Sequence, residues 1–189
     1  MTDHVGLLRA VNVSGTGAIA MDDLRAVGVH LGFADVRTVR QTGNLLFRSP
    51  STPARALEAR LERALEKQLG ITTDCLVRTA DAWRAVLDLN PFPAEATSDP
   101  AHLLVVFLKE RPLPQSERRL RGSIRGRERV RVIGAEAFVV YPDGIGRSRL
   151  TLPVLERAVG SRGTGRNWNT VREVARQLDD RRSASGEGG

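Results

Sequence analysis

Apolar positions in the first 78 residues alternate between the spacing typical of strands and the spacing typical of helices. The pattern predicts strand, helix, strand, strand, helix and strand, at residues 5–13, 21–31, 36–41, 44–48, 52–69 and 72–78. The second helix is the clearest, because Leu57, Leu61 and Leu65 lie on one apolar stripe that stops at Gly70. This order of elements is the split βαβ, or ferredoxin-like, pattern.

A unit of this kind buries one face of its sheet under its helices. We therefore expect the four strands to form one sheet with both helices on the same face. Leu24 of the first helix should then be buried together with Leu57, Leu61 and Leu65 of the second. Residues 1–79 are the expected extent of this half.

The rest of the chain predicts a second, smaller α+β half over residues 80–180. Its expected elements are a helix, a strand, a hairpin, a short helix and a final helix, at residues 80–89, 103–108, 129–141, 151–159 and 168–178. Residues 92–100 and 160–165 are expected to be connections without regular structure. The polar tail, residues 181–189, is expected to be disordered.

The composition is that of a globular protein, since 41% of the 189 residues are hydrophobic and 27% are charged. No apolar run approaches the roughly 20 residues that span a bilayer, so we expect no membrane contact. The chain opens with an acidic residue instead of a basic segment followed by an apolar one, which predicts a cytoplasmic location. The sequence contains no pattern that indicates the oligomeric state.

Metal and disulfide chemistry are not expected. Cys75 is the only cysteine, and its apolar neighbourhood favours a small core residue over a catalytic thiol. The three histidines, His4, His30 and His102, do not have the spacing of metal ligands. No segment carries a cofactor-binding signature, so we predict neither a metal nor another cofactor.

The formal charge of +7 comes from arginine, because Lys67 and Lys109 are the only lysines and 29 minus 2 leaves 27 arginines. Arginine favours bidentate contacts with phosphate or carboxylate. Eight arginines lie between Arg111 and Arg131, but no aromatic residues are interleaved with them to stack on bases. We interpret this run as a solvated surface, and nucleic acid is the less favoured partner.

Two polar segments near the C-terminus combine glycine with donor side chains. YPDGIGRSRL begins at Tyr141, and GRNWNT begins at Gly165. The candidate ligand-binding residues in them are Arg147, Ser148, Arg149, Arg166, Asn167, Asn169 and Thr170. Because a helix is expected to start beside the second segment, its free N–H groups would also favour an anion.

Four polar residues of the first half complete the predicted small-anion site as its opposite wall: Arg9, Asn12, Gln41 and Asn44. Within the site, we expect Arg147 and Arg166 to hold one anionic group. A purely structural alternative stays open, in which Asn167 caps the last helix and the two arginines bond buried carbonyls.

No nucleophile elbow, phosphate-binding loop or pair of histidines accompanies these residues, so no catalytic residue is assigned. Three classes of function stay open. The favoured one is a protein that binds a small phosphate or nucleotide. The alternatives are an enzyme acting on such a ligand and a nucleic-acid-binding or purely structural protein.

Five segments together resemble a known family: LLRAVNVSG, QTGNLLFRS, NPF, PDGIGRSRL and TGRNWNT. In order and spacing they are similar to the hallmarks of a large bacterial family catalogued as domain of unknown function 1697. The similarity extends over about residues 4–178 and implies a two-part α+β protein whose first part is ferredoxin-like. It implies no established activity. Thr42, Ala10 and Arg149 depart from the usual serine, glycine and lysine, and these changes leave the chemistry of the predicted site intact.

Overall fold

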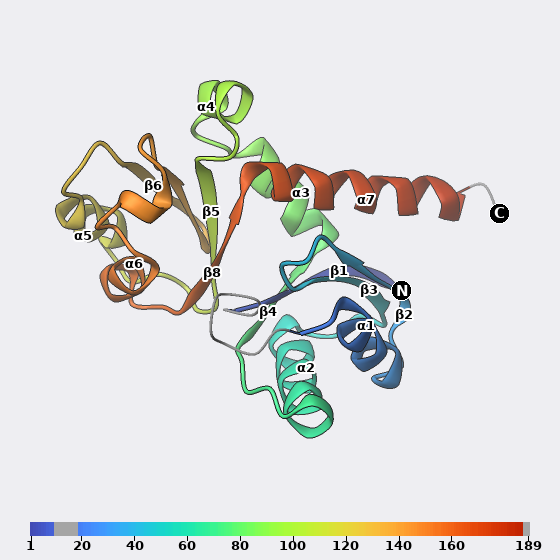
Figure 1. Cartoon of the computed structure of the whole chain (residues 1–189). Coiled ribbons are helices and arrows are strands. Elements are labelled where there is room, and N and C mark those ends of the chain that lie inside the picture. The colour runs from blue at the N-terminus through green and yellow to red at the C-terminus, as the bar shows by residue number, and fades with distance from the viewer. Residues whose placement is uncertain (10–18, 187–189) are drawn as a thin grey trace. The chain divides into compact units, whose positions relative to one another are not determined.

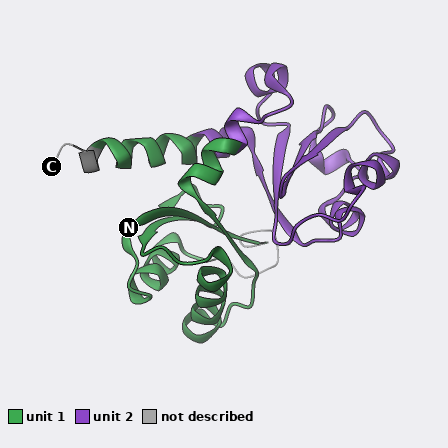
Figure 2. Ribbon diagram, turned by 180° about the vertical axis from the view of Figure 1, so that it is seen from behind, with its two compact units in different colours: residues 1–85, 173–189 green, residues 86–172 purple. Residues whose placement is uncertain are grey.

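The computed structural model describes residues 1–9 and 19–186, with side chains as far as Ser183. The chain divides into two compact units, which Figure 2 colours green and purple. Unit 1 comprises residues 1–85 and 173–189, and unit 2 comprises residues 86–172. The final helix therefore contributes to unit 1, whereas the sequence grouped residues 80–180 together.

Unit 1 contains one four-stranded antiparallel sheet with the strand order β2-β3-β1-β4. Its elements are β1 (Thr2–Leu8), α1 (Met21–His30), β2 (Ala34–Val39), β3 (Asn44–Ser49), α2 (Ala54–Leu69) and β4 (Cys75–Thr79). The predicted order of strand, helix, strand, strand, helix and strand is thus confirmed (Figure 1). Asn12 lies outside the described residues, together with the rest of residues 10–18.

Helices α1 and α2 cover the same face of this sheet. Leu24 of α1 shares one buried cluster with Leu57, Leu61 and Leu65 of α2, as predicted. The strands contribute Leu45, Phe47, Cys75 and Val77 to the same cluster. Cys75 is a buried free cysteine, in agreement with the core role inferred from its neighbours.

The last helix, α7 (Trp168–Gly186), is longer than the sequence predicted. Residues 181–186, expected to be disordered, continue the helix instead. Arg181 gives the physical reason, because its side chain is buried in unit 1. Its guanidinium donates to the carbonyl oxygen of Asp35 and lies 3.6 Å from an Asp3 carboxylate oxygen. These contacts hold the end of α7 to unit 1.

Unit 2 repeats the element order of unit 1. Its strand order is β6-β7-β5-β8, and its elements are β5 (Leu103–Leu108), α5 (Ser116–Ser123), β6 (Arg129–Ile133), β7 (Glu136–Val140), the 3-10 turn η1 (Ile145–Arg147), α6 (Leu152–Val159) and β8 (Gly163–Asn167). Helices α5 and α6 pack on one face of the sheet (Figure 1). Helix α3 (Ala80–Asp88) and the short helix α4 (Pro93–Ser98) precede β5.

Two segments predicted to be connections are regular. Residues 163–167 form β8, and residues 93–98 form α4. Strand β8, with the sequence GTGRN, has Thr164 as its one β-branched residue and no aromatic residue, so it carries little of the composition that marks a strand. Gly163 is required there by close approach, because a Cβ atom would lie 2.8 Å from the carbonyl oxygen of Phe107 on β5. Because Gly163 has no side chain, β5 can lie close beside it. This glycine therefore lies within a strand, where the sequence suggested a loop.

His4 on β1 is expected to make the stability of the folded protein depend on pH. The imidazole is 2% exposed and stacks on Phe47, and neither ring nitrogen has a hydrogen-bond partner among the described residues. Burial lowers the pKa of His4, and the neighbouring Asp3 carboxylate opposes this shift. Below pH 6.5 the unfolded chain therefore binds a proton that the folded chain does not, and stability falls.

The expected loss is at most about 1.4 kcal/mol per pH unit, beginning near pH 6.5 and ending at the folded pKa of His4. Urea unfolding at several pH values measures it. His4→Phe keeps the stacked ring and removes the titration, so its stability should vary less over the same range. An equal slope in both proteins would contradict the assignment to His4.

Candidate functional site

The PDGIGRSRL segment forms a closed loop after β7 in unit 2. Tyr141 begins the loop, and its buried hydroxyl donates to the carbonyl oxygen of Leu150 at 3.0 Å. Burial raises the pKa of this hydroxyl, which therefore stays protonated. Gly144 turns the chain with φ at +82°, and its N–H donates to the Tyr141 carbonyl oxygen. The loop is thus fixed at both of its ends.

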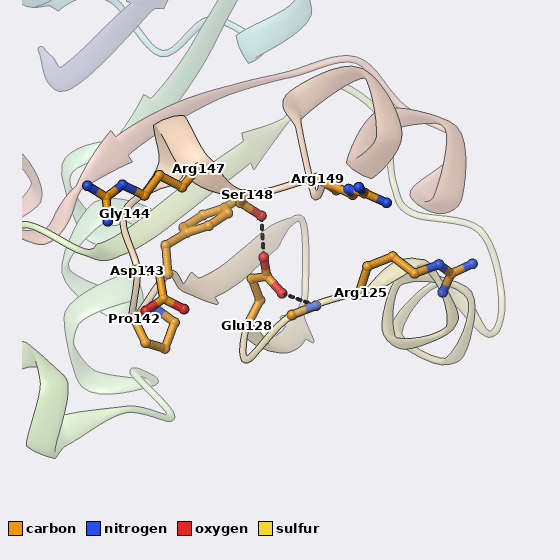
Figure 3. A pocket seen from close by; sticks show the side chains of 10 residues that line it. Arg125, Glu128, Pro142, Asp143, Gly144, Arg147, Ser148 and Arg149 are labelled. Atoms are coloured by element: carbon orange, nitrogen blue, oxygen red, sulfur yellow. Dashed lines mark hydrogen bonds between the residues drawn. The ribbon is translucent and has the colours of Figure 1, made fainter.

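A cavity of about 180 Å³ lies against this loop. We call it the unit 2 pocket, and its lining residues are Arg125, Gly126, Glu128, Tyr141, Pro142, Asp143, Gly144, Arg147, Ser148 and Arg149. They come from the segment between α5 and β6 and from the loop after β7 (Figure 3). Of the predicted site residues, the pocket brings together Arg147, Ser148 and Arg149.

Glu128 and Ser148 join the two segments that line the pocket. The Ser148 hydroxyl donates to Glu128 Oε1, and the Gly126 N–H donates to Glu128 Oε2 at 3.0 Å. The Leu150 N–H in turn donates to Ser148 Oγ at 2.9 Å. The bond from Ser148 lowers the pKa of Glu128, so this carboxylate is ionised at neutral pH.

The second carboxylate of the pocket, that of Asp143, already has a cationic partner. Arg127 bonds both of its oxygens, and this pairing lowers the pKa of Asp143. The two side chains are exposed, so the ion pair adds little stability. The Arg127–Asp143 pair as a whole carries no net charge.

Arg125, Arg147 and Arg149 are exposed, and none of them forms an ion pair with a described residue. Among the described residues, Arg125 donates to the backbone carbonyl oxygens of Gly122 and Ile124. In Figure 3, Arg147 extends to one side of the Glu128–Ser148 bond, and the other two arginines extend to the opposite side. Three arginines less one unpaired glutamate leave a charge of +2 at the pocket.

Arg166 is not among the residues lining the unit 2 pocket. It lies on β8 and is 7% exposed. Its Nη1 donates to Thr164 Oγ1 at 2.7 Å and to the Gly165 carbonyl oxygen at 2.9 Å. Burial lowers the pKa of Arg166 to about 10, and the group is still a cation at neutral pH. The expected pairing of Arg147 with Arg166 in one cavity gains no support from this geometry.

The rest of the GRNWNT segment begins the last helix. Asn167 Oδ1 accepts hydrogen bonds from the N–H and the hydroxyl of Thr170, each at 3.0 Å. This is the capping role of the structural alternative. Asn169 is half-buried beside them, and none of the three lines the unit 2 pocket.

The site residues predicted from the first half lie in unit 1. Asn44 is fully buried, and its amide donates to the Val39 carbonyl oxygen at 2.9 Å and to Thr42 Oγ1 at 2.8 Å. It therefore stabilises the turn between β2 and β3, where Gln41 is exposed. Arg9 is half-buried, and its backbone bonds the segment before β4.

Arg125 and Glu128 line the pocket but were not predicted as site residues. The sequence did contain a usable signal, because the β6–β7 hairpin was expected. That hairpin pairs Arg129 with Val140, so the residues before β6 meet those after β7. Extending the register by a few residues would have placed Glu128 beside the PDGIGRSRL loop.

Two further properties of the described residues bear on the class of protein. No group of three or more His, Cys, Asp or Glu side chains is placed to hold a metal ion in the part of the chain that the structure describes. None of its helices combines the length and apolarity needed to cross a bilayer.

The fold and the pocket define a two-unit α+β protein with an arginine-rich pocket in its second unit. The chain belongs to the family described as "Protein of unknown function (DUF1697)", whose model matches residues 1–138. The match ends before the PDGIGRSRL loop. A structure of a conserved bacterial protein from Streptococcus pneumoniae is similar, with a TM-score of 0.71 and 21% identity over 94% of this chain and 98% of that one. A comparison with curated proteins gives no match.

Proposed function

We propose that the protein binds a small anion of the phosphate type in the unit 2 pocket, through Arg125, Arg147 and Arg149. The observation that carries the proposal is the charge around the cavity, where three arginines meet one carboxylate that lacks a cationic partner. Guanidinium groups offer forked donors that match phosphate oxygens. Gly126 lacks the Cβ atom that would lie 2.8 Å from Glu128 Oε2, which leaves room for this carboxylate beside the pocket.

The volume of the pocket limits the size of the ligand. At about 180 Å³ the cavity is smaller than the roughly 300–1,000 Å³ typical of sites that enclose a drug-sized molecule. A phosphate group with a short organic part fits this volume. A whole nucleotide would extend beyond it, so a nucleotide would be held by its phosphate with the base outside.

Binding without catalysis is favoured over an enzyme. Ser148 and Glu128 form a hydroxyl–carboxylate pair, which is the only arrangement around the pocket resembling a nucleophile and its base. A general base is most effective when its pKa lies near the working pH. Glu128 has a lowered pKa instead, so it is a weak base toward the serine proton.

Nucleic acid is a less favoured ligand, and the local ion pairs of the arginine run support this ranking. Arg121 and Arg131 both bond Glu117, and Arg129 bonds Glu95. These acids would have to be displaced or left facing phosphates by a nucleic-acid backbone. The pairs are typical of a solvated surface.

Arg149→Gln tests the proposal. The substitution keeps a polar side chain of similar reach and removes one charge-assisted contact, so we expect the affinity for inorganic phosphate to fall about tenfold. Isothermal titration calorimetry at low ionic strength measures the affinity. The melting temperature of the free protein should change little, because Arg149 is exposed.

Arg119→Gln is the matched control, because Arg119 is an exposed arginine of α5 in the same unit that does not line the pocket. It changes the net charge equally and should leave phosphate binding unaltered. Equal losses in the two variants would mean that phosphate responds only to overall charge, and the pocket would then be rejected as its site.

A further inference from the structure

The unit 2 pocket offers acceptors as well as donors, and Ser148 is the first of them. A hydroxyl has one proton and two acceptor lone pairs. The Ser148 proton is directed to Glu128 Oε1, and one lone pair accepts the Leu150 N–H at 2.9 Å. Toward a ligand, Ser148 therefore presents one free lone pair and no proton.

Glu128 is also restricted to accepting hydrogen bonds from a ligand. Each of its oxygens already accepts one bond, Oε1 from Ser148 and Oε2 from the Gly126 N–H. An ionised carboxylate has about four acceptor positions, so about two are left. These two bonds also fix the carboxylate in place at the edge of the cavity.

The donors of the pocket lie around this acceptor pair. Figure 3 shows the Glu128–Ser148 bond between Arg147 on one side and Arg125 and Arg149 on the other. Arginine only donates hydrogen bonds, so these side chains suit the oxygens of an anion. The dianionic phosphate group of a monoester has no hydroxyl, so against Glu128 it would be repelled by the negative charge and could donate no hydrogen bond to it.

We propose that the ligand carries a hydroxyl group close to its phosphate, as sugar phosphates and polyol phosphates do. The phosphate is held by the arginines, and the hydroxyl donates to Glu128 or Ser148. This inference rests on the proposed anion-binding function of the same pocket. A hydroxyl fits better than an ammonium group because the pocket already carries a charge of +2, from three arginines less Glu128.

Two esters of equal chain length separate the hydroxyl contribution from that of phosphate. Glycerol 3-phosphate and propyl phosphate differ only in two hydroxyl groups. We expect the wild-type protein to bind glycerol 3-phosphate about fivefold to tenfold more tightly, the effect of one or two hydrogen bonds to acceptors that include a charged group. Calorimetric titration of both esters measures the ratio.

Glu128→Gln assigns the preference to its residue. The substitution replaces one acceptor oxygen by a donor and removes a negative charge. We expect the ratio between the two esters to fall below about twofold, while propyl phosphate binds as tightly as before or more tightly. Asp88→Asn is the matched control, because it removes the same charge from an exposed carboxylate of unit 2 that does not line the pocket, and it should keep the wild-type ratio.

The outcomes distinguish this inference from the function on which it rests. If neither ester nor inorganic phosphate binds the wild-type protein, both proposals are overturned. Equal binding of the two esters would support the anion site and contradict the proposal that the ligand carries a hydroxyl group. A preference that persists in Glu128→Gln also rejects the inference, because the hydroxyl would then be recognised elsewhere. The comparison on wild-type protein holds even if a variant folds poorly.

Discussion

Arg166→Ala is expected to lower the free energy of unfolding by about 2–4 kcal/mol and to leave phosphate affinity unchanged. The side chain is buried, so its removal leaves a cavity on β8. Thr164 Oγ1 and the Gly165 carbonyl oxygen lose their donor at the same time. Phosphate affinity is unaffected because Arg166 does not line the unit 2 pocket. Urea unfolding and phosphate titration of the same variant measure the two quantities.

Arg166→Met separates packing from hydrogen bonding at this position. Methionine fills much of the volume of the arginine side chain and carries no charge. It therefore avoids the cost of desolvating a buried cation, the same cost that lowers the pKa of Arg166. The loss of stability should therefore be smaller than in Arg166→Ala. Should Arg166→Ala keep its melting temperature and lose phosphate affinity, the assignment of Arg166 to the core would be wrong.

A chain that ends at Asp180 should be less stable than the full chain by about 3–5 kcal/mol, the cost of removing one partner from a buried ion pair. The deletion removes Arg181, which is 6% exposed and lies 3.6 Å from the Asp3 carboxylate. The buried Asp3 Oδ1 would then lose the guanidinium that lies 3.6 Å from it. Arg181→Ala should reproduce most of the loss, and urea unfolding measures both.

A chain that ends at Ser183 is the control for this deletion, because it keeps Arg181 and its bond to Asp35. Its stability should stay close to that of the full chain. If the chain ending at Asp180 is equally stable, the end of α7 does not hold to unit 1 and the tail behaves as the sequence predicted.

The fold of unit 1 was predictable because each element carries a local signal. Leu57, Leu61 and Leu65 repeat at helical spacing and mark the apolar side of α2. Because α1 and α2 bury their apolar sides against the same sheet face, the position of both helices could be predicted. Strand β8 had no such signal. Gly163 and Gly165 suggested a loop, whereas they serve close packing against Phe107 and Leu104 on β5. Such contacts join residues more than 50 positions apart, and no local pattern shows them.

The site was predictable only in part, for a similar reason. Arg147, Ser148 and Arg149 follow a turn that glycine marks, and they do line a pocket. Arg166 has the same chemistry, but its side chain is buried on a strand, and its burial depends on the register of β8 with β5. The side-chain oxygen of Asn167, Oδ1, accepts the capping bond from the Thr170 N–H and is therefore occupied within the protein.

The central claim is that Arg125, Arg147 and Arg149 hold a phosphate-type anion, and arginine side-chain NMR tests it most directly. The Nε–Hε resonances of assigned arginines are followed while phosphate is added at constant ionic strength. Saturable shifts are expected at these three residues, and none at Arg166 or at Arg119 of α5. Shifts at Arg166 without shifts at the pocket, or changes spread evenly over the exposed arginines, would contradict the central claim.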